Sequence, residues 1–380
     1  MLFSLTGYAA KNASGQVVEF PAPDSLVVVD RIVLEGNRIT RDHIIARELV
    51  FAVGDTLSIS VLRGLIESSR ENLQNTLLFN FVDAKIKLSG KGIPGATITF
   101  MFTERWYVWP WPVIDFADRN FNTWWSENRD LSRMSYGIAL KWENFRGRKE
   151  NLEFTAIFGY EELYGFDYTI PYLNREETIG LAFGASYGRS GEVPVKSEHD
   201  KLVYYKDDDD VIDVVSARMN LIIRKAIYNT HVIRLAYDNR NFDDTLLAIN
   251  PAFSVGNSSN LQYLTLAYQF KSDHRDYRAY PLEGYYFDAE LGKHGLGLLD
   301  NGGLDVFYAS ATFRKYFRLS GRWFYASGLN ARFSNDREQP FFMNRAIGYG
   351  RDIVRGYQYY VVHGNNFGIF KNNVKFALLP

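Results

Sequence analysis

The sequence predicts a mainly β protein, in which a small α+β domain precedes a transmembrane antiparallel β-barrel. Aromatic residues make up 16% of the 380 residues and charged residues 23%. A membrane barrel accounts for a high content of both aromatic and charged residues, because it carries aromatic girdles at both membrane interfaces and keeps a polar interior. The spacing of apolar residues also changes from helical to alternating near Trp106, and short and long connections follow one another from there on.

Composition excludes several other classes of protein. The net charge of −1 offers no electrostatic attraction to nucleic acid, and the lack of cysteine excludes disulfides and thiolate sites. The sequence contains no run of eighteen or more apolar residues, so a membrane-spanning helix is not expected. The sequence has no phosphate loop, nucleophile elbow or defensible pair of catalytic carboxylates, so we expect no enzyme and no cofactor. The six histidines lack ligand spacing and the run Asp207–Asp210 reads as a solvated exterior loop, so no metal site is expected.

Residues 1–24 are predicted to be a signal-peptide remnant or a disordered start. Residues 25–104 contain, in order, a strand, two helices and two strands. Thr40 is the predicted N-cap of the first helix, and Ser58 that of the second, whose apolar residues recur at helical spacing. Such a domain covers one face of its sheet with helices and leaves a sheet edge on which an extended segment of another protein can pair.

From Trp106 onward, apolar residues alternate with polar or small ones. A charge at a lipid-facing midplane position costs about 2 to 4 kcal/mol, so the apolar positions are predicted to face lipid and the others the interior of a barrel. Alternation alone also fits a soluble sandwich of two sheets. In the run from Arg133 to Trp142 the apolar set is Met134, Tyr136, Ile138, Leu140 and Trp142.

The connections favour the barrel over the sandwich. Short turns such as "FRGRK", "KAIYN" and "LSGR" are followed or preceded by long stretches, among them 189–210, 240–259 and 334–364. Only "EELYG" is a short connection where a long one is expected. Barrels of the outer membrane show short turns at one rim and long loops at the other. We therefore predict about twelve strands in a barrel domain over residues 105–380, the first at Trp111 to Phe121.

Two motifs in this region resemble a known family. The sequence "VRGY", which is Val354, Arg355, Gly356 and Tyr357, lies in the long connection before the last predicted strand. The stretch "DHRDYRAYPLEGYYFDAELG" is similar to a pattern that opens a strand past mid-barrel. Both resemble the BamA/TamA superfamily of outer-membrane assembly factors, the bacterial surface antigen barrels, and residues 25–104 resemble a POTRA domain. The residues of the second motif are Asp273, Arg275, Asp276, Tyr280, Pro281 and Gly284.

The resemblance implies a barrel of sixteen strands, so we expect the last strands to be missing after Pro380. It also implies that Arg355 docks against acidic residues that project inward from late strands. This chain departs from the family there, because Lys375 is predicted to face the interior where an acid is frequent, and a lysine cannot pair with an arginine. Either the partner of Arg355 follows residue 380 or the contact is rearranged.

The function that the resemblance implies is assembly of outer-membrane proteins. The POTRA domain, in the periplasm, would capture unfolded β-barrel clients by strand addition, and the barrel would insert them into the lipid bilayer. Accessory lipoproteins or periplasmic chaperones are further expected partners, and nucleic acid is not. An alternative is a translocation pore of the same superfamily that exports a dedicated partner or passenger protein, which a single POTRA domain favours. A passive channel is a third reading.

Overall fold

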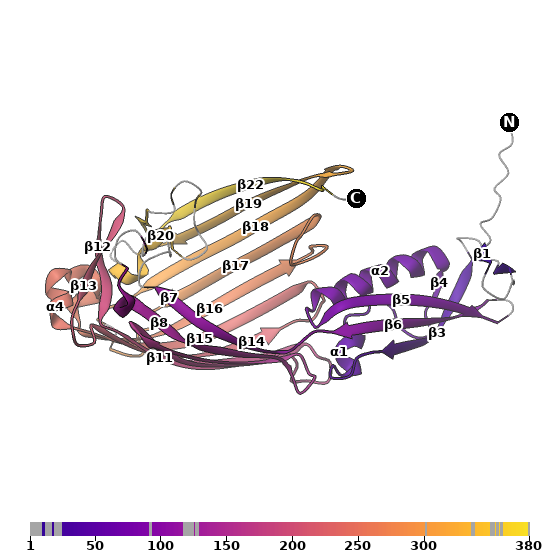
Figure 1. Cartoon of the computed structure of the whole chain (residues 1–380), viewed down its shortest axis with the longest axis horizontal. Helices are drawn as coiled ribbons and strands as arrows, with labels where there is room; N and C mark the ends of the chain where they lie inside the picture. Colours follow the sequence, from indigo (N-terminus) through magenta and orange to yellow (C-terminus); the bar gives the residue numbers. More distant parts are fainter. Residues whose placement is uncertain are drawn as a thin grey trace. The chain divides into compact units, whose positions relative to one another are not determined.

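The computed structural model describes residues 25–90, 93–116, 125, 129–300, 302–335, 339–349, 354, 357 and 360–378, preceded by two short paired strands, β1 (Ala10–Lys11) and β2 (Val17–Val18). The chain forms two compact units, Met1–Arg105 and Trp106–Pro380 (Figure 1). The first combines helices with strands and the second is built mainly from β-strands, as predicted. Within the described parts, the helices are too short or too polar to cross a membrane.

The first unit is an α+β domain. Its sheet has the order β4-β3-β6-β5, with β3 and β6 parallel and the other neighbours antiparallel. Alternate residues of the central strands, such as Val29 and Phe100, are fully buried, and so is Leu62 of the long helix, because strand and helix each present one apolar face to the other. The elements are β3 (Leu26–Glu35), α1 (Asp42–Ala46), β4 (Thr56–Ser58), α2 (Ile59–Asn75), β5 (Phe79–Ser89) and β6 (Gly95–Glu104).

One of the two predicted helix caps is confirmed and the other is wrong. The side chain of Ser58 accepts a hydrogen bond from the amide of Val61 at the start of α2. At the start of α1, Arg41 takes the N-cap position instead of Thr40 and makes no side-chain cap bond. The helix begins one residue later than predicted because Arg41 still has extended backbone angles (φ −74°, ψ 145°), and the Glu104 carboxylate at the end of β6 accepts the amides of Ile39 and Thr40 just before it.

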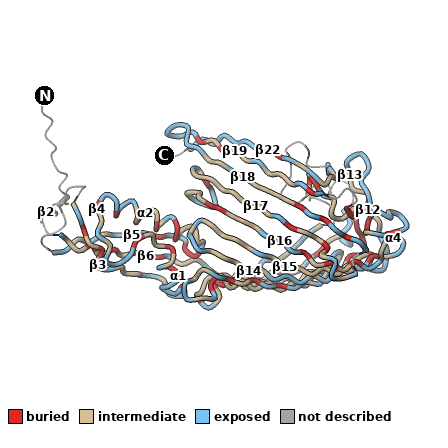
Figure 2. Tube along the Cα trace, turned by 180° about the vertical axis from the view of Figure 1, so that it is seen from behind, coloured by how far each residue is buried: buried red, intermediate tan, exposed pale blue. Residues whose placement is uncertain are grey.

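The second unit is one antiparallel sheet of twelve strands, in which each strand pairs with its neighbours in sequence order. Among the described strands, β7 and β22 each pair on one side only, so the sheet is open. It is strongly curved (Figures 1 and 2). The strands are β7 (Val108–Phe116), β8 (Met134–Phe145), β9 (Glu150–Gly159), β10 (Glu161–Ile170), β11 (Ile179–Ser190), β14 (Ile212–Ile223), β15 (Asn229–Phe242), β16 (Asn260–Asp273), β17 (Gly284–His294), β18 (Val306–Ser320), β19 (Trp323–Ser334) and β22 (Phe367–Phe376).

The first strand and one connection differ from the prediction. β7 begins at Val108, opposite Trp142, and not at Trp111; residues 117–121 of the predicted strand lie outside the described residues. Two prolines in β7 obscured its start, but an edge strand tolerates them because it needs ladder bonds on one side only. The residues "EELYG" are strand, not connection, since β10 pairs with β11 from Glu161 on. Tyr160 alone links β9 to β10, and Gly159 turns the chain there with a φ of 104°.

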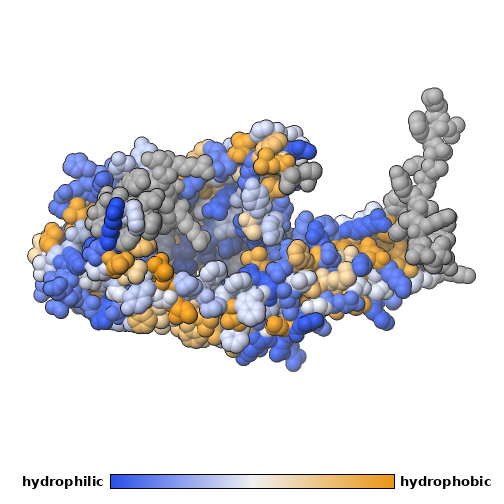
Figure 3. Space-filling model, in the orientation of Figure 1, coloured by the Kyte–Doolittle hydropathy of each residue, from blue (hydrophilic) through white to orange (hydrophobic). Residues whose placement is uncertain are grey.

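The two faces of the sheet differ in polarity as the alternation predicts. Ile138, Phe154 and Met219 are 49%, 45% and 50% exposed, and all lie on the same face, which we call the apolar face. Figure 3 shows hydrophobic side chains gathered on the outside of the sheet. The opposite, polar face carries paired acids and bases. The sorting of whole faces, rather than of single residues, is what a sheet in contact with both lipid and water requires.

The long connections pack together at one rim. Their apolar residues form a common buried core, which includes Val195, Leu246, Phe253 and Val306. Buried positions gather where these connections meet (Figure 2). We call this region the loop cluster. Its elements are β12 (Glu192–Glu198), β13 (Lys201–Lys206), α4 (Asp244–Ile249), η3 (Pro251–Phe253), η4 (Val255–Asn257), η5 (Phe341–Met343), β20 (Arg345–Ile347) and β21 (Val362–His363), and a further turn, η2 (Leu131–Arg133), precedes β8.

Candidate functional site

The predicted strand-start motif forms the connection between β16 and β17, residues 274–283, which we call the rim strap. Asp273, the last residue of β16, is 6% exposed and binds two arginines. Arg275 Nε lies 2.7 Å and Arg278 Nε 2.9 Å from its carboxylate. The hydrogen bond to Asp273 also raises the pKa of Arg275. Asp273, Arg275 and Arg278 therefore stabilise this turn together, since a buried carboxylate needs basic partners.

The other end of the strap is fixed by Asp276 and Gly284. The Asp276 carboxylate accepts the amide of Leu282 at 3.1 Å, and backbone hydrogen bonds join His274 to Tyr285. Gly284 has a φ of 96°, and a Cβ there would lie 2.0 Å from the His274 carbonyl oxygen. Only glycine fits a position with both constraints. The motif glycine is thus explained by the geometry of the turn.

Tyr280 and Pro281, the remaining motif residues, contact the last described strand. Lys375 Nζ of β22 donates a hydrogen bond of 2.9 Å to the Pro281 carbonyl and lies 4.1 Å from the centre of the Tyr280 ring. Lys375 lies on the polar face, in the position that its alternation predicts. The sequence did not indicate these contacts, because alternation gives the face of a residue and not its partner across the sheet.

The structure describes only part of the VRGY motif. Arg355 and Gly356 lie outside the described residues, so the docking of Arg355 stays a prediction. Val354 accepts a hydrogen bond from the Tyr357 amide at 3.0 Å, and Tyr357 is 60% exposed. Further along the same connection, the amide of Val361 donates to the carbonyl of Asp200 at the β12–β13 turn, at 2.8 Å. This part of the connection belongs to the loop cluster.

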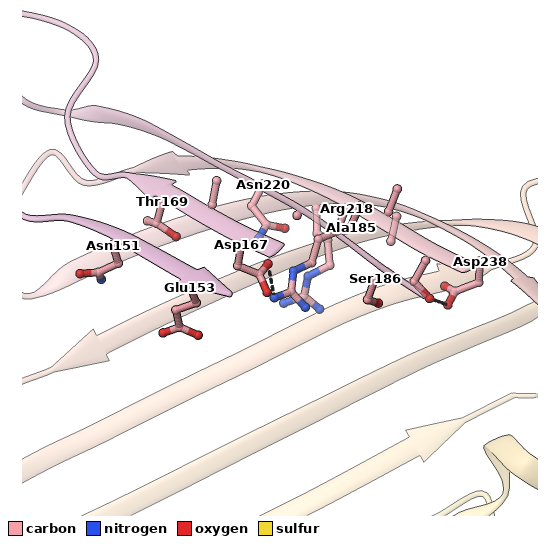
Figure 4. Close-up of a pocket in the computed structure, with 15 residues that line it drawn as sticks. Asn151, Glu153, Asp167, Thr169, Ala185, Ser186, Arg218, Asn220 and Asp238 are labelled. Atoms are coloured by element: carbon pink, nitrogen blue, oxygen red, sulfur yellow. Dashed lines mark hydrogen bonds and ion pairs between the residues drawn. The ribbon is translucent and has the colours of Figure 1, made fainter. Parts of the chain in front are cut away.

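A pocket of about 700 Å³ opens on the polar face over strands β9 to β15. In Figure 4, Asp167 and Arg218 point toward each other within it, and Glu153 and Asn151 project from the neighbouring strand β9. Arg218 lies 2.5 Å from the Asp167 carboxylate, and Ser216 donates to Asp238 at 2.7 Å. The lining side chains are thus polar, mixed in charge and hydrogen-bonded to each other across strands.

Small residues make room for this network. Gly184 lies between Asp167 and Arg218 in the register of the sheet. A Cβ at Gly184 would lie 2.0 Å from an Asp167 carboxylate oxygen and 2.7 Å from the Phe166 carbonyl. The ion pair of Asp167 and Arg218 was not predicted, although alternation places both residues on the inward face of their strands. No residue pattern in a single sequence gives the pairing of strands β10, β11 and β14.

The described acids of the polar face do not form a metal site. Within the described parts of the chain, no three histidine or acidic side chains are grouped so as to hold a metal ion. The acids of the polar face are instead engaged with basic or hydroxyl groups. For example, Glu290 accepts from Tyr308 at 2.7 Å and lies 3.3 Å from Arg234. The arrangement can present fixed charges and hydrogen-bonding groups to a polar chain or solute.

Comparison with known proteins assigns the first unit. Residues 27–105 match the family model described as POTRA, surface antigen variable number repeat. None of the curated protein sequences compared with the chain matches it.

Three solved structures are similar in fold at low sequence identity. The structure of BamA from Haemophilus ducreyi lacking POTRA domains 1–3 is 17% identical with a TM-score of 0.48, and the match covers 95% of this chain and 65% of that one. CdiB from Acinetobacter baumannii is 15% identical with a TM-score of 0.49, at 93% and 61% coverage. CdiB from Escherichia coli is 13% identical with a TM-score of 0.49, at 98% and 80% coverage. The chain thus spans less than two thirds of the first two proteins.

The chain combines three features. A POTRA domain occupies residues 27–105, and a twelve-stranded antiparallel sheet with one apolar and one polar face follows it. The long connection before the last described strand carries the "VRGY" sequence. The family model thus assigns residues 27–105 to the POTRA family.

Proposed function

We propose that this protein acts in the bacterial outer membrane as an assembly factor that inserts unfolded β-barrel proteins into the lipid bilayer. The observation that carries the proposal is the two-faced sheet that follows a POTRA domain in one chain. The apolar face suits contact with lipid and the polar face suits contact with water. The POTRA domain would lie in the periplasm. The action is non-enzymatic, and its driving force is the folding of the client.

The POTRA domain offers an edge for capturing clients. Among the described strands, β5 pairs only with β6, so its other edge is available to an extended segment. Phe81 on this strand is 68% exposed and provides an apolar contact beside that edge. Pairing through backbone groups is largely independent of sequence, so one edge can receive many different client strands. Accessory lipoproteins or periplasmic chaperones would deliver these clients.

A reconstitution experiment tests the proposal. The purified chain is placed in liposomes, an unfolded outer-membrane barrel is added, and folding of that client is followed by its shift in gel mobility. We expect faster folding than in liposomes without the chain. Equal rates with and without the chain would contradict an assembly function.

A pair of substitutions tests the role of β5. Phe81→Ala is expected to slow client folding, because it removes the exposed ring beside the free edge. Val61→Ala is the matched control, since Val61 is also exposed, at 50%, but lies on helix α2 of the same domain. Equal slowing by both variants would show that the edge has no special part in capture.

A second candidate function is a translocation pore for one dedicated partner or passenger protein. Under this alternative, replacing Arg355 abolishes export of one protein and leaves the overall composition of the outer membrane unchanged. A passive channel would instead give ion conductance without any effect on client folding.

A further inference from the structure

A second pocket on the polar face, of about 380 Å³, lies beside the rim strap. Its floor is made by two small residues of β19, Ala326 and Gly328. Strand register places Arg314 of β18 opposite Gly328 on one side and Lys371 of β22 opposite it on the other. The pocket is therefore a gap in one row of side chains, with a cation at each end of the row.

The spacing of this row suits a small ligand. Neighbouring strands lie about 4.8 Å apart, so the backbones that carry Arg314 and Lys371 are about 10 Å apart. Both side chains are long enough to reach over the glycine between them. A Cβ on Gly328 would lie 3.3 Å from the Arg314 Cγ atom, so the absence of a side chain leaves space for the arginine stem.

The next row adds neutral hydrogen-bonding groups and closes one end. Tyr316 and Asn373 lie opposite Ala326 on its two sides. Lys375 lies 5.7 Å from the centre of the Tyr316 ring. Because Lys375 is also bound to Pro281 of the rim strap, the strap closes the pocket toward that rim.

The charge of the pocket is one-sided. Of the described residues that line it, three are basic and none is acidic. Of the nearby acids, Glu283 pairs with Arg318 at 2.5 Å, Asp273 pairs with Arg275 and Arg278, and Asp288 accepts a hydrogen bond from Gln269 at 2.8 Å. The larger pocket over β9 to β15 differs, because acids and bases both line it.

We propose that this pocket binds a phosphate monoester group, with Arg314 and Lys371 as its principal ligands. A phosphate monoester carries about −1.5 to −2 charges at neutral pH and three acceptor oxygens. Two facing cations, an amide and a hydroxyl match that charge and number of acceptors better than they match a carboxylate, which has a single charge. Arginine can bind two phosphate oxygens at once and lysine adds a point charge. The group can come from free phosphate or from a lipid headgroup.

Binding is measured on the whole chain in detergent micelles. Inorganic phosphate is titrated at constant ionic strength and compared with chloride and acetate, with tryptophan fluorescence during thermal unfolding as the readout. We expect phosphate alone to raise the unfolding temperature. Arg314→Gln and Lys371→Gln should each weaken binding at least about tenfold, since a charged hydrogen bond contributes about 1.5 to 3 kcal/mol. Lys225→Gln, in the exposed β14–β15 turn, is the matched control and should bind normally.

One further variant tests the space in the pocket, and one comparison of lipids tests the source of the phosphate. Gly328→Val retains both cations but fills the floor, so it should abolish binding in a protein that still folds. Nanodiscs with phosphatidic acid are compared with nanodiscs of phosphatidylcholine alone, which distinguishes a lipid headgroup from free phosphate. Binding of either phosphate source supports the proposal. Equal binding of acetate or of an acidic peptide, or unchanged binding by the double variant of Arg314 and Lys371, would overturn it. No client protein is needed, so this result does not depend on the proposed assembly function.

Discussion

Lys375 near the end of β22 holds the backbone of Pro281, which lies in the connection before β17. Its Nζ atom donates to the Pro281 carbonyl at 2.9 Å. β18 and β19 separate β17 from β22 in the sheet, so the contact joins segments that are not neighbours in the strand order. The lysine that departs from the family pattern therefore has a structural partner in the family's other motif.

Replacing this lysine should release the rim strap. Lys375→Met removes the hydrogen bond to Pro281 and the charge above the Tyr280 ring, at a cost of about 1 to 2 kcal/mol. We expect faster tryptic cleavage after Arg278 in the native chain. Lys293→Met is the control, because Lys293 has an ion pair of 3.1 Å with Asp305 away from the strap. Equal cleavage rates in the two variants would show that Lys375 does not restrain the strap.

Sequence reasoning predicted most strands of the second unit because most of them are amphipathic. Tyr136 and Ile138, for example, were placed on the outward face by alternation alone and lie on the apolar face. It failed where one residue decides a local conformation. Tyr160 is a complete connection, which a strand pattern cannot reveal, and the backbone of Arg41 is still extended, so α1 begins one residue later than a cap at Thr40 predicts.

The candidate sites were predicted less completely than the fold. The motifs drew attention to Pro281 and Gly284, but Lys375 was recognised only as an inward cation. The row of Arg314, Gly328 and Lys371 depends on the register of three strands. Register is determined by pairing partners across the sheet, and a single sequence contains no information on those partners beyond which face each residue occupies.

Gly284 should tolerate no side chain. Gly284→Ala forces an L residue to a φ of 96° and places its Cβ 2.0 Å from the His274 carbonyl, so we expect a loss of about 1 to 3 kcal/mol in stability. Gly321→Ala is the matched control, because Gly321 lies in the β18–β19 turn and a Cβ there meets no atom within 4 Å. Unfolding in urea, followed by tryptophan fluorescence in micelles, compares them. The prediction fails if both variants unfold at the same urea concentration.

The ion pair of Arg218 and Asp167 should contribute little by itself. Their side chains are 55% and 37% exposed, so a double-mutant cycle with Arg218→Gln and Asp167→Asn should give a coupling below about 1 kcal/mol. Gly184→Ala should cost more, about 1 to 3 kcal/mol, because its Cβ meets the Phe166 carbonyl at 2.7 Å as well as the carboxylate.

The control for Gly184 is Gly165→Ala on the neighbouring strand. A Cβ at Gly165 meets its nearest atom at 3.8 Å, which is ordinary contact, so this variant should keep the stability of the parent chain. Urea unfolding is measured for the parent chain, the two single variants and the double variant of the cycle, and the two glycine variants. A coupling well above 1 kcal/mol would show that water screens this pair less than its exposure indicates.

Acid should loosen the loop cluster at His363. Burial, and then the charge of Arg345, lower the pKa of His363 below its ordinary value of 6.5, and its Nδ1 atom is buried without a hydrogen-bond partner among the described residues. The unfolded ring therefore binds protons more readily, so the stability of this region is full above about pH 6.5 and falls as the pH drops below it.

Hydrogen exchange of the β20–β21 amides, corrected for intrinsic rates, should rise between pH 7.5 and pH 5. His363→Gln should remove that rise, whereas His199→Gln, in the exposed β12–β13 turn, should leave it unchanged. A rise that persists in His363→Gln would assign the effect to another group.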